Sequence, residues 1–182
     1  MNRKQFLKTS TLAGASLLTV KPGLSALGSE KKEKVRLGFI GVGARGQSHV
    51  EECAKRNDVE IVAFADPDEA WAIKSGQIIL ENAGRPEAVV YANGDYDYLN
   101  LLKRTDIDAV FISTADFQHA LHTIEAVKAG CDTYTEKPLA ETMEDNRAVL
   151  KAVKDSKKIV QIGSQRRSGE NYWAADESIK SG

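Results

Sequence analysis

A short apolar run followed at once by a glycine-rich turn is the feature that most limits how this chain can fold. Residues 35–40 read VRLGFI, which is typical of a buried strand. The turn that follows has the spacing G-x-G-x-x-G and consists of Gly41, Val42, Gly43, Ala44, Arg45 and Gly46. A strand that leads through such a turn into a helix gathers free N–H groups where phosphates bind. A glycine-rich turn without a ligand is the alternative.

Strands and helices are expected to alternate along the rest of the chain. The apolar runs that predict strands cover residues 35–40, 59–65, 89–91, 109–113, 133–135 and 159–163. The segments that predict helices cover residues 44–56, 69–82, 96–103, 118–129 and 142–156. This alternation predicts a parallel sheet with helices on both faces. With the glycine turn at its start, it indicates a doubly wound α/β domain of the Rossmann type over residues 35–163.

Asp66 is the residue best placed to assist the glycine turn. It follows the second expected strand, where a carboxylate receives the adenosine ribose hydroxyls of a dinucleotide. Asp68 and Glu69 add negative charge, and no arginine follows immediately to attract a 2′-phosphate. The sequence therefore predicts NAD rather than NADP as the cofactor. A helix-capping role before Pro67 is compatible with this interpretation.

Composition excludes several other classes of function. With 42% hydrophobic and 28% charged residues and a net charge of -1, the chain gives no reason to expect nucleic acid or an anionic membrane as partner. The 182 residues suffice for one domain with a core and are few for two full-sized ones. Cys53 and Cys131 are too few for a disulfide framework, and we expect both to be buried. The histidines show no metal-ligand spacing with them, so no metal site is predicted.

The N-terminal residues 1–28 have the layout of an export signal. A basic segment with Arg3 and Lys4 precedes a mildly apolar stretch over residues 9–20, which is too short to span a bilayer. The basic segment resembles a twin-arginine signal, with Lys4 in place of the second arginine. We therefore expect a bacterial protein exported to the periplasm, without membrane association once the signal is removed, and a charged linker over residues 29–34. A disordered basic tail is the alternative.

Further residues carry a resemblance to a known family. Besides the glycine turn, they are Ser113, Thr114, His119, Glu136, Lys137 and Pro138. Over residues 35–182 the chain resembles the Gfo/Idh/MocA oxidoreductases, which include glucose–fructose oxidoreductase and inositol dehydrogenase. The resemblance implies that Ser113, Thr114 and His119 border the cofactor.

The Glu-Lys-Pro triplet carries the chemistry that this resemblance implies. In the family, its glutamate lies by the nicotinamide ribose and its lysine lies between nicotinamide and substrate. Glu136 would therefore border the cofactor, and Lys137 would hold the reacting oxygen and stabilise charge as hydride moves. A cis peptide bond would precede Pro138. From the residues alone, Glu136 and Lys137 could equally form a surface ion pair at a strand end.

The chain also departs from the family. Residues 115–117 read Ala-Asp-Phe where the family commonly has Pro-Asn-His or a similar trio. Arg166 and Arg167 follow the last expected strand, where they would contact substrate or form a solvated turn. Residues 164–182 are expected to be the crossover to a second α/β domain that supplies most of the substrate pocket, and the chain looks truncated inside the first helix of that domain.

Three functions remain open at this point. The resemblance implies an NAD-dependent oxidoreductase, expected to be homo-oligomeric, that acts on a sugar, polyol or sugar derivative by hydride transfer. Some relatives instead hold NAD permanently and cleave glycosidic bonds through transient oxidation of the sugar. The third alternative is a truncated, non-catalytic NAD-binding fragment.

Overall fold

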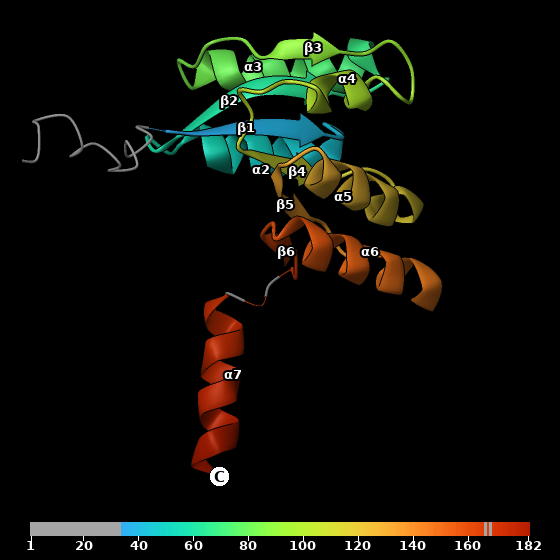
Figure 1. The fold of residues 1–182 in the computed structure, drawn as a ribbon. Helices are drawn as coiled ribbons and strands as arrows, with labels where there is room; N and C mark the ends of the chain where they lie inside the picture. The colour runs from blue at the N-terminus through green and yellow to red at the C-terminus, as the bar shows by residue number, and fades with distance from the viewer. Residues whose placement is uncertain (1–33, 166, 168) are drawn as a thin grey trace, which may run out of the picture. The chain divides into compact units, whose positions relative to one another are not determined.

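The computed structural model describes residues 34–165, 167 and 169–182, and Figure 1 shows their fold. The strands are β1 (Val35–Ile40), β2 (Val59–Ala65), β3 (Val89–Tyr91), β4 (Ala109–Ile112), β5 (Asp132–Thr135) and β6 (Val160–Ile162). The α-helices are α2 (Ala44–Ala54), α3 (Lys74–Asn82), α4 (Tyr98–Leu102), α5 (His119–Lys128), α6 (Met143–Ser156) and α7 (Glu170–Ser181). Two short elements are the π-helical turn η1 (Glu69–Ile73) and the 3₁₀ turn η2 (Asp116–Gln118). None of the helices in the described ranges is long and apolar enough to cross a membrane.

The six strands form one parallel sheet, as the sequence predicts. Their order is β3-β2-β1-β4-β5-β6, the order of a Rossmann fold, and it reverses between β1 and β4. At the carboxyl end of β1, Ile40 pairs with Ala65 of β2 on one side and Ile112 of β4 on the other. The segments that follow these three strands therefore leave the sheet next to one another. Open α/β sheets bind their ligands at such a point.

The core lies on both faces of the sheet, because successive residues of a strand point to opposite sides. On one face, Phe39 packs with Val50 of α2 and Leu80 of α3, all fully buried. On the other face, Ile40 packs with Leu101 of α4. Burial of each such side chain contributes about 1.5–3 kcal/mol. The two clusters fix the carboxyl end of β1 between helices on both faces of the sheet (Figure 1).

Two helices differ from their expected form, although their positions agree. The helix expected over residues 69–82 is divided into η1 and α3, and the carboxylate of Asp68 accepts a hydrogen bond from Trp71 N–H at 3.0 Å at the start of η1. This bond caps the first turn of η1. The helix expected from residue 118 is preceded by η2. Gly130 has a φ of 91° after α5, as expected of a C-terminal cap.

Both cysteines are buried, as the sequence predicts. Burial raises the pKa of Cys131 and raises that of Cys53 to about 11. The thiols therefore stay protonated at neutral pH, which makes them poor nucleophiles.

The expected export signal, all but the last residue of the linker, and Arg166 lie outside the described residues. Residues 164–182 include α7, which buries none of its side chains.

Candidate functional site

The glycine turn joins β1 to α2 in a conformation that side chains would prevent. Gly41 has a φ of 86°, and a Cβ there would lie 2.7 Å from the carbonyl carbon of Ser113. A Cβ on Gly46 would lie 2.2 Å from the carbonyl oxygen of Gly41. Gly43 precedes α2 and supplies no side-chain cap. The N–H groups of the first turn of α2 therefore stay available at the positive end of the helix dipole.

Asp66 is held against this turn. Its Oδ2 atom accepts a hydrogen bond from the N–H of Val42 at 2.7 Å, and its Oδ1 atom accepts one from Asp68 N–H at 2.9 Å. These two backbone hydrogen bonds thus fix the orientation of the Asp66 carboxylate. Each carboxylate oxygen can accept more than one hydrogen bond, so the group can still receive hydroxyls from a ligand.

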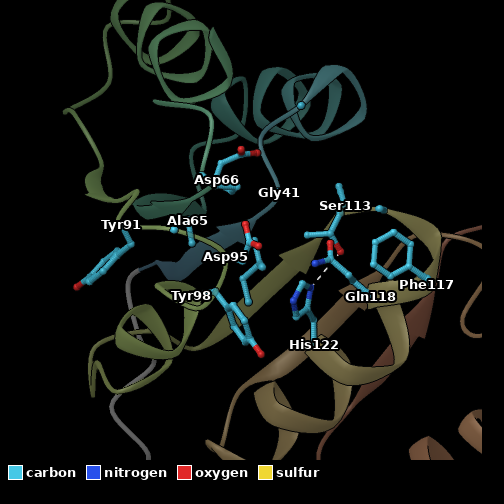
Figure 2. A pocket seen from close by; sticks show the side chains of 16 residues that line it. Gly41, Ala65, Asp66, Tyr91, Asp95, Tyr98, Ser113, Phe117, Gln118 and His122 are labelled. Carbon is cyan, nitrogen blue, oxygen red and sulfur yellow. Dashed lines mark hydrogen bonds between the residues drawn. The ribbon is translucent and has the colours of Figure 1, made fainter. Parts of the chain in front are cut away.

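A cavity of about 460 Å³ opens between the glycine turn, Asp66 and the loop that follows β4 (Figure 2). The residues that line it are Ile40, Gly41, Gly43, Ala65, Asp66, Pro67, Tyr91, Gly94, Asp95, Tyr98, Ser113, Thr114, Ala115, Phe117, Gln118 and His122. Its volume is that of a typical small-molecule site. Among these described lining residues, Asp66 and Asp95 carry negative charge and no lysine or arginine balances them. The cavity therefore disfavours an additional phosphate group at this end.

Tyr98 and His122 form an inner wall of this cavity, and sequence reasoning assigned neither of them a role. Their rings are tilted against each other at 59° with centroids 4.3 Å apart, and His122 Nδ1 lies 3.0 Å from the hydroxyl oxygen of Thr114. Burial, helped by the nearby His119, lowers the pKa of His122 to about 4, so the ring is neutral at neutral pH. The available clue was the spacing of His119 and His122, which puts both on the same buried face of the helix.

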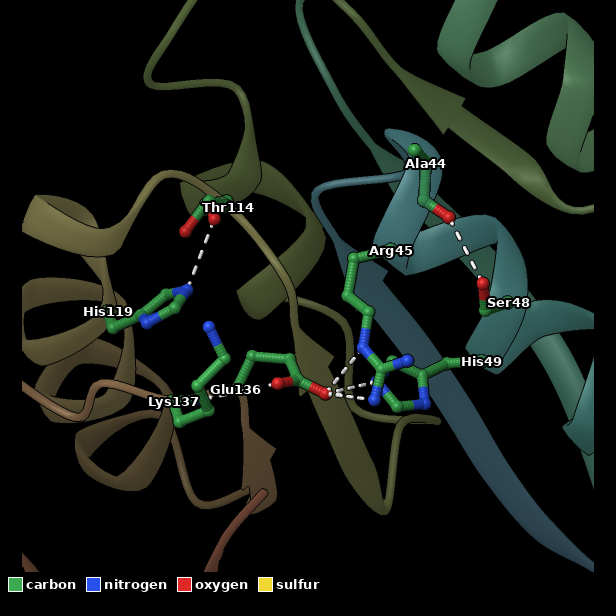
Figure 3. A network of polar contacts seen from close by, with 8 residues as sticks. All are labelled: Ala44, Arg45, Ser48, His49, Thr114, His119, Glu136 and Lys137. Atoms are coloured by element: carbon green, nitrogen blue, oxygen red, sulfur yellow. Dashed lines mark hydrogen bonds and ion pairs between the residues drawn. The ribbon is translucent and has the colours of Figure 1, made fainter. Parts of the chain in front are cut away.

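Glu136 is a buried carboxylate with two hydrogen-bond donors from α2 (Figure 3). Its Oε1 atom accepts hydrogen bonds from Arg45 Nε at 2.8 Å and from His49 Nε2 at 2.7 Å. Burial favours a higher pKa, but the hydrogen bonds from His49 and Arg45 outweigh it and bring the pKa of Glu136 below its ordinary value. The surface ion pair with Lys137 that the residues alone allowed is therefore not what forms. His49 is the member of this group that sequence reasoning missed.

Lys137 lies at the edge of a second, smaller cavity of about 120 Å³. The lining residues are Arg45, Ser113, Thr114, Asp116, His119, Glu136, Lys137 and Gln165. The Lys137–Pro138 peptide bond is cis, as the resemblance implies. The ammonium of Lys137 makes no hydrogen bond or ion pair with another described residue (Figure 3). Ser113 and Thr114 border both cavities, so the two spaces adjoin.

His119 links the loop after β4 to the Glu-Lys-Pro segment. Its Nδ1 atom lies 2.6 Å from the carbonyl oxygen of Pro138, and its Nε2 atom lies 3.1 Å from that of Thr114. The ring is buried, and both nitrogens face backbone oxygens. The structure thus gives His119 a role in holding two loops together, and a direct contact with the cofactor stays a prediction.

Of the two arginines predicted to contact substrate, the structure describes Arg167 alone. Arg167 is exposed and is absent from both cavity walls, while Arg166 lies outside the described residues. Gln165, just before them, lines the smaller cavity instead. Ala44 is the exposed first residue of α2, so its N–H belongs to the free first turn.

These features define a class of protein. A phosphate-binding turn, a carboxylate fixed beside it and a cavity at the point where strand order reverses make a dinucleotide-binding Rossmann domain. The hydroxyl of Ser113 supports this fit, since it is buried in the cavity wall and has no hydrogen-bond partner among the described residues. A bound dinucleotide would give this hydroxyl a partner.

Comparison with known families identifies the chain more closely. Residues 35–164 match the family model GFO_IDH_MocA, an oxidoreductase family with an NAD-binding Rossmann fold. The chain belongs to the Gfo/Idh/MocA family, and its described domain is an NAD-binding Rossmann domain.

The chain is also similar to individual known proteins. The chain is 36% identical over 162 residues to an alpha-N-acetylgalactosaminidase from Shewanella oneidensis, a match that covers 80% of this chain and 35% of that protein. A myo-inositol dehydrogenase from Lactobacillus casei, solved with NAD(H) and myo-inositol, is 30% identical with a TM-score of 0.67, over 82% of this chain and 42% of that one. The WlbA dehydrogenase from Chromobactrium violaceum, solved with NADH and UDP-GlcNAcA, is 26% identical with a TM-score of 0.70, over 83% and 41%. The chain thus spans about a third of the length of its curated relative.

Proposed function

We propose that this chain is the NAD-binding part of an oxidoreductase that acts on a sugar, polyol or sugar derivative by hydride transfer. The observation that carries this proposal is the position of Lys137. Its unpaired ammonium borders a small cavity that adjoins the larger cavity beside the glycine turn. The complexes of the two dehydrogenases with myo-inositol and UDP-GlcNAcA support this class of substrate.

The residues of the larger cavity would hold the cofactor. The N–H groups of Ala44, Arg45 and Gly46 would bind the pyrophosphate at the start of α2. Asp66 would accept hydrogen bonds from the adenosine ribose hydroxyls. Ser113 would donate its unpaired hydroxyl from the wall that the two cavities share. NAD, when bound, supplies the hydride acceptor.

Lys137 would act on the substrate oxygen. In the oxidation direction, the substrate hydroxyl must lose its proton as its carbon loses hydride, so negative charge develops on that oxygen. The Lys137 ammonium can donate a hydrogen bond there and stabilise the charge. Glu136, engaged by Arg45 and His49, would border the cofactor and fix the backbone of Lys137.

The test of this role is the pair Lys137→Met and Lys137→Arg in the protein that carries this chain. NADH formation would be followed with a panel of polyols, sugars and nucleotide sugars. We expect kcat of Lys137→Met to fall by roughly 10²- to 10³-fold, as when a preorganised donor to a developing oxyanion is removed, with little change in NADH affinity. Lys137→Arg should keep part of the activity. Unchanged kcat in Lys137→Met would contradict the proposal.

A second candidate is an NAD-dependent glycosidase. It is favoured by the 36% identity to the alpha-N-acetylgalactosaminidase. In such a reaction the sugar is oxidised transiently and reduced again, so no net redox change occurs. Release of the aglycone from a chromogenic α-N-acetylgalactosaminide, without added cofactor and without accumulation of NADH, would favour this candidate. Accumulation of NADH with a free sugar or polyol would favour the dehydrogenase.

We also propose that residues 1–28 export the protein to the periplasm. The order of basic, apolar and small residues in the sequence supports this. Fusing these 28 residues to a folded passenger protein and measuring its periplasmic fraction tests the proposal. The passenger should appear in the periplasm through the twin-arginine pathway, and replacing Arg3 with glutamine should stop export. Retention of the unmodified fusion in the cytoplasm would contradict it.

A further inference from the structure

The side chain of His49 is mostly enclosed and lies outside the lining of both cavities. It is 13% exposed, and its ring centroid lies 5.4 Å from that of Phe111 and 5.2 Å from that of Tyr134. It lines neither of the two cavities of the candidate site. Its one polar contact in the described part of the chain is with Glu136, at 2.7 Å. A polar effect of His49 on the site therefore passes through Glu136.

Glu136 needs such a partner because its carboxylate is buried. A buried charge is costly unless it is paired and hydrogen-bonded. Arg45 and His49 both reach the same oxygen, Oε1, from positions four residues apart on one face of α2. The Arg45 side chain is 42% exposed and borders the smaller cavity, whereas His49 is enclosed by rings. His49 is thus the enclosed partner and Arg45 the solvent-exposed one.

The protonation state of His49 follows from its surroundings. Burial lowers the pKa of His49, against the opposing effect of the hydrogen bond with Glu136, so the ring is neutral at neutral pH. An ionised carboxylate only accepts, hence the proton must be on Nε2. Within the described residues, Arg45, His49 and Tyr134 interact electrostatically with this carboxylate, and Lys137, Asp116 and His119 line the smaller cavity with it. Arg45 then supplies the positive charge that balances Glu136, and the hydrogen bond from His49 fixes the orientation of the carboxylate.

The other carboxylate oxygen of Glu136 reaches the backbone of the next residue. Oε2 accepts a hydrogen bond from Lys137 N–H at 3.2 Å. On the far side of Lys137, the carbonyl oxygen of Pro138 is held by His119 at 2.6 Å. The backbone that carries the Lys137 ammonium is therefore anchored at both ends, and His49 fixes one of the two anchors.

We propose that His49 is a positioning residue that, through Glu136, fixes the Lys137 backbone and couples it to the helix that starts at the glycine turn. This inference rests on the proposed role of Lys137 at the substrate oxygen. It links the phosphate-binding and substrate-facing ends of the site by one enclosed hydrogen bond. Occupation of the glycine turn and placement of Lys137 then depend on each other through α2.

Three variants of the whole 182-residue chain test the proposal. His49→Phe keeps the ring among Phe111 and Tyr134 but removes the donor. His49→Gln keeps a donor near the position of Nε2. Phe111→Leu is the matched control, because it loosens the ring packing and leaves the polar contacts in place. For each, NMR would follow the Glu136 carboxyl carbon against pH and the exchange rate of the Lys137 amide, and a fluorescence titration would give NADH affinity.

In His49→Phe we expect the Glu136 titration to move to higher pH, the Lys137 amide to exchange faster, and NADH affinity to fall roughly tenfold, the effect of losing one hydrogen bond to a charged group. In His49→Gln, the Glu136 titration, the Lys137 amide exchange rate and the NADH affinity should return toward their wild-type values. In Phe111→Leu, Glu136 should titrate at the same pH as in wild type. Wild-type values in His49→Phe, or equal shifts in His49→Phe and Phe111→Leu, would overturn the proposal. The Glu136 and Lys137 resonances are read without substrate, so failure of the proposed catalytic role of Lys137 would show separately, as unchanged kcat in Lys137→Met.

Discussion

The carboxylate of Asp66 accepts a hydrogen bond from the backbone N–H of Val42 at 2.7 Å, so the acid that follows β2 is fastened to the turn that follows β1. The second oxygen of Asp66 is held by Asp68 N–H. The glycine turn and the acid that follows β2 are therefore one preorganised unit. Because little must be ordered on binding, less of the interaction energy is lost to conformational entropy.

Substitutions at two glycines of the turn should separate folding from binding. In Gly46→Ala the new Cβ would lie 2.2 Å from the backbone oxygen of Gly41, which cannot move aside cheaply. We expect its free energy of unfolding to fall by about 1–3 kcal/mol. In Gly43→Ala the nearest atom is a ring carbon of Trp71 at 4.0 Å, so stability should stay close to wild type. NADH affinity should still fall, because the methyl group blocks approach of the pyrophosphate. Urea unfolding and NADH titration of both variants check this, and equal stability of the two would contradict it.

Stability should depend on pH through His122. Its pKa is lowered by burial to about 4 in the folded state, so as pH falls the unfolded chain takes up the proton first. This group therefore costs stability progressively from its ordinary pKa near 6.5 down to about 4, and nothing further below that. The total is about 3 kcal/mol at most. Urea unfolding across this pH range should show a weaker pH dependence in His122→Phe than in wild type. Parallel curves would show that the ring is not protected from protonation.

Trp71 should report cofactor binding. Its ring is 52% exposed and lies beside Gly43 at the mouth of the glycine turn. Reduced nicotinamide absorbs at the wavelengths where tryptophan emits, so bound NADH should quench Trp71 by energy transfer. Trp173 lies on α7 and borders neither cavity. Titration with NADH should therefore quench wild type and Trp173→Phe strongly and Trp71→Phe weakly. The reverse pattern would place the cofactor elsewhere.

Much of the fold could be predicted because its determinants are local. The run over residues 35–40, the glycine spacing after it and the position of Asp66 at a strand end each follow from short-range pattern. The cis bond before Pro138 followed from the family resemblance, and the structure confirms it. The π-helical turn η1 could not be predicted, because the Asp68 N-cap at its start is equally compatible with a regular α-helix.

The partners of Glu136 could not be predicted for a different reason. His49 and Glu136 are separated by 87 residues and meet only because β1, β4 and β5 lie next to one another in the sheet. A histidine in the middle of a helix and a glutamate before a lysine give no sign in sequence that they touch. From sequence alone, Lys137 was therefore a candidate ion-pair partner of Glu136. In the fold, Arg45 and His49 of α2 are its partners instead.

The measurement that tests the central claim most directly is a titration of the chain and its Asp66→Asn variant with NADH and NADPH, beside a thermal unfolding control. If Asp66 receives the adenosine ribose in this cavity, wild type should bind NADH and bind NADPH more weakly. The variant should bind NADH roughly ten- to hundredfold more weakly, as expected for loss of a charged hydrogen-bond acceptor, and should lose most of its preference over NADPH. Equal NADH affinity of the two folded proteins, or a wild-type preference for NADPH, would contradict the account.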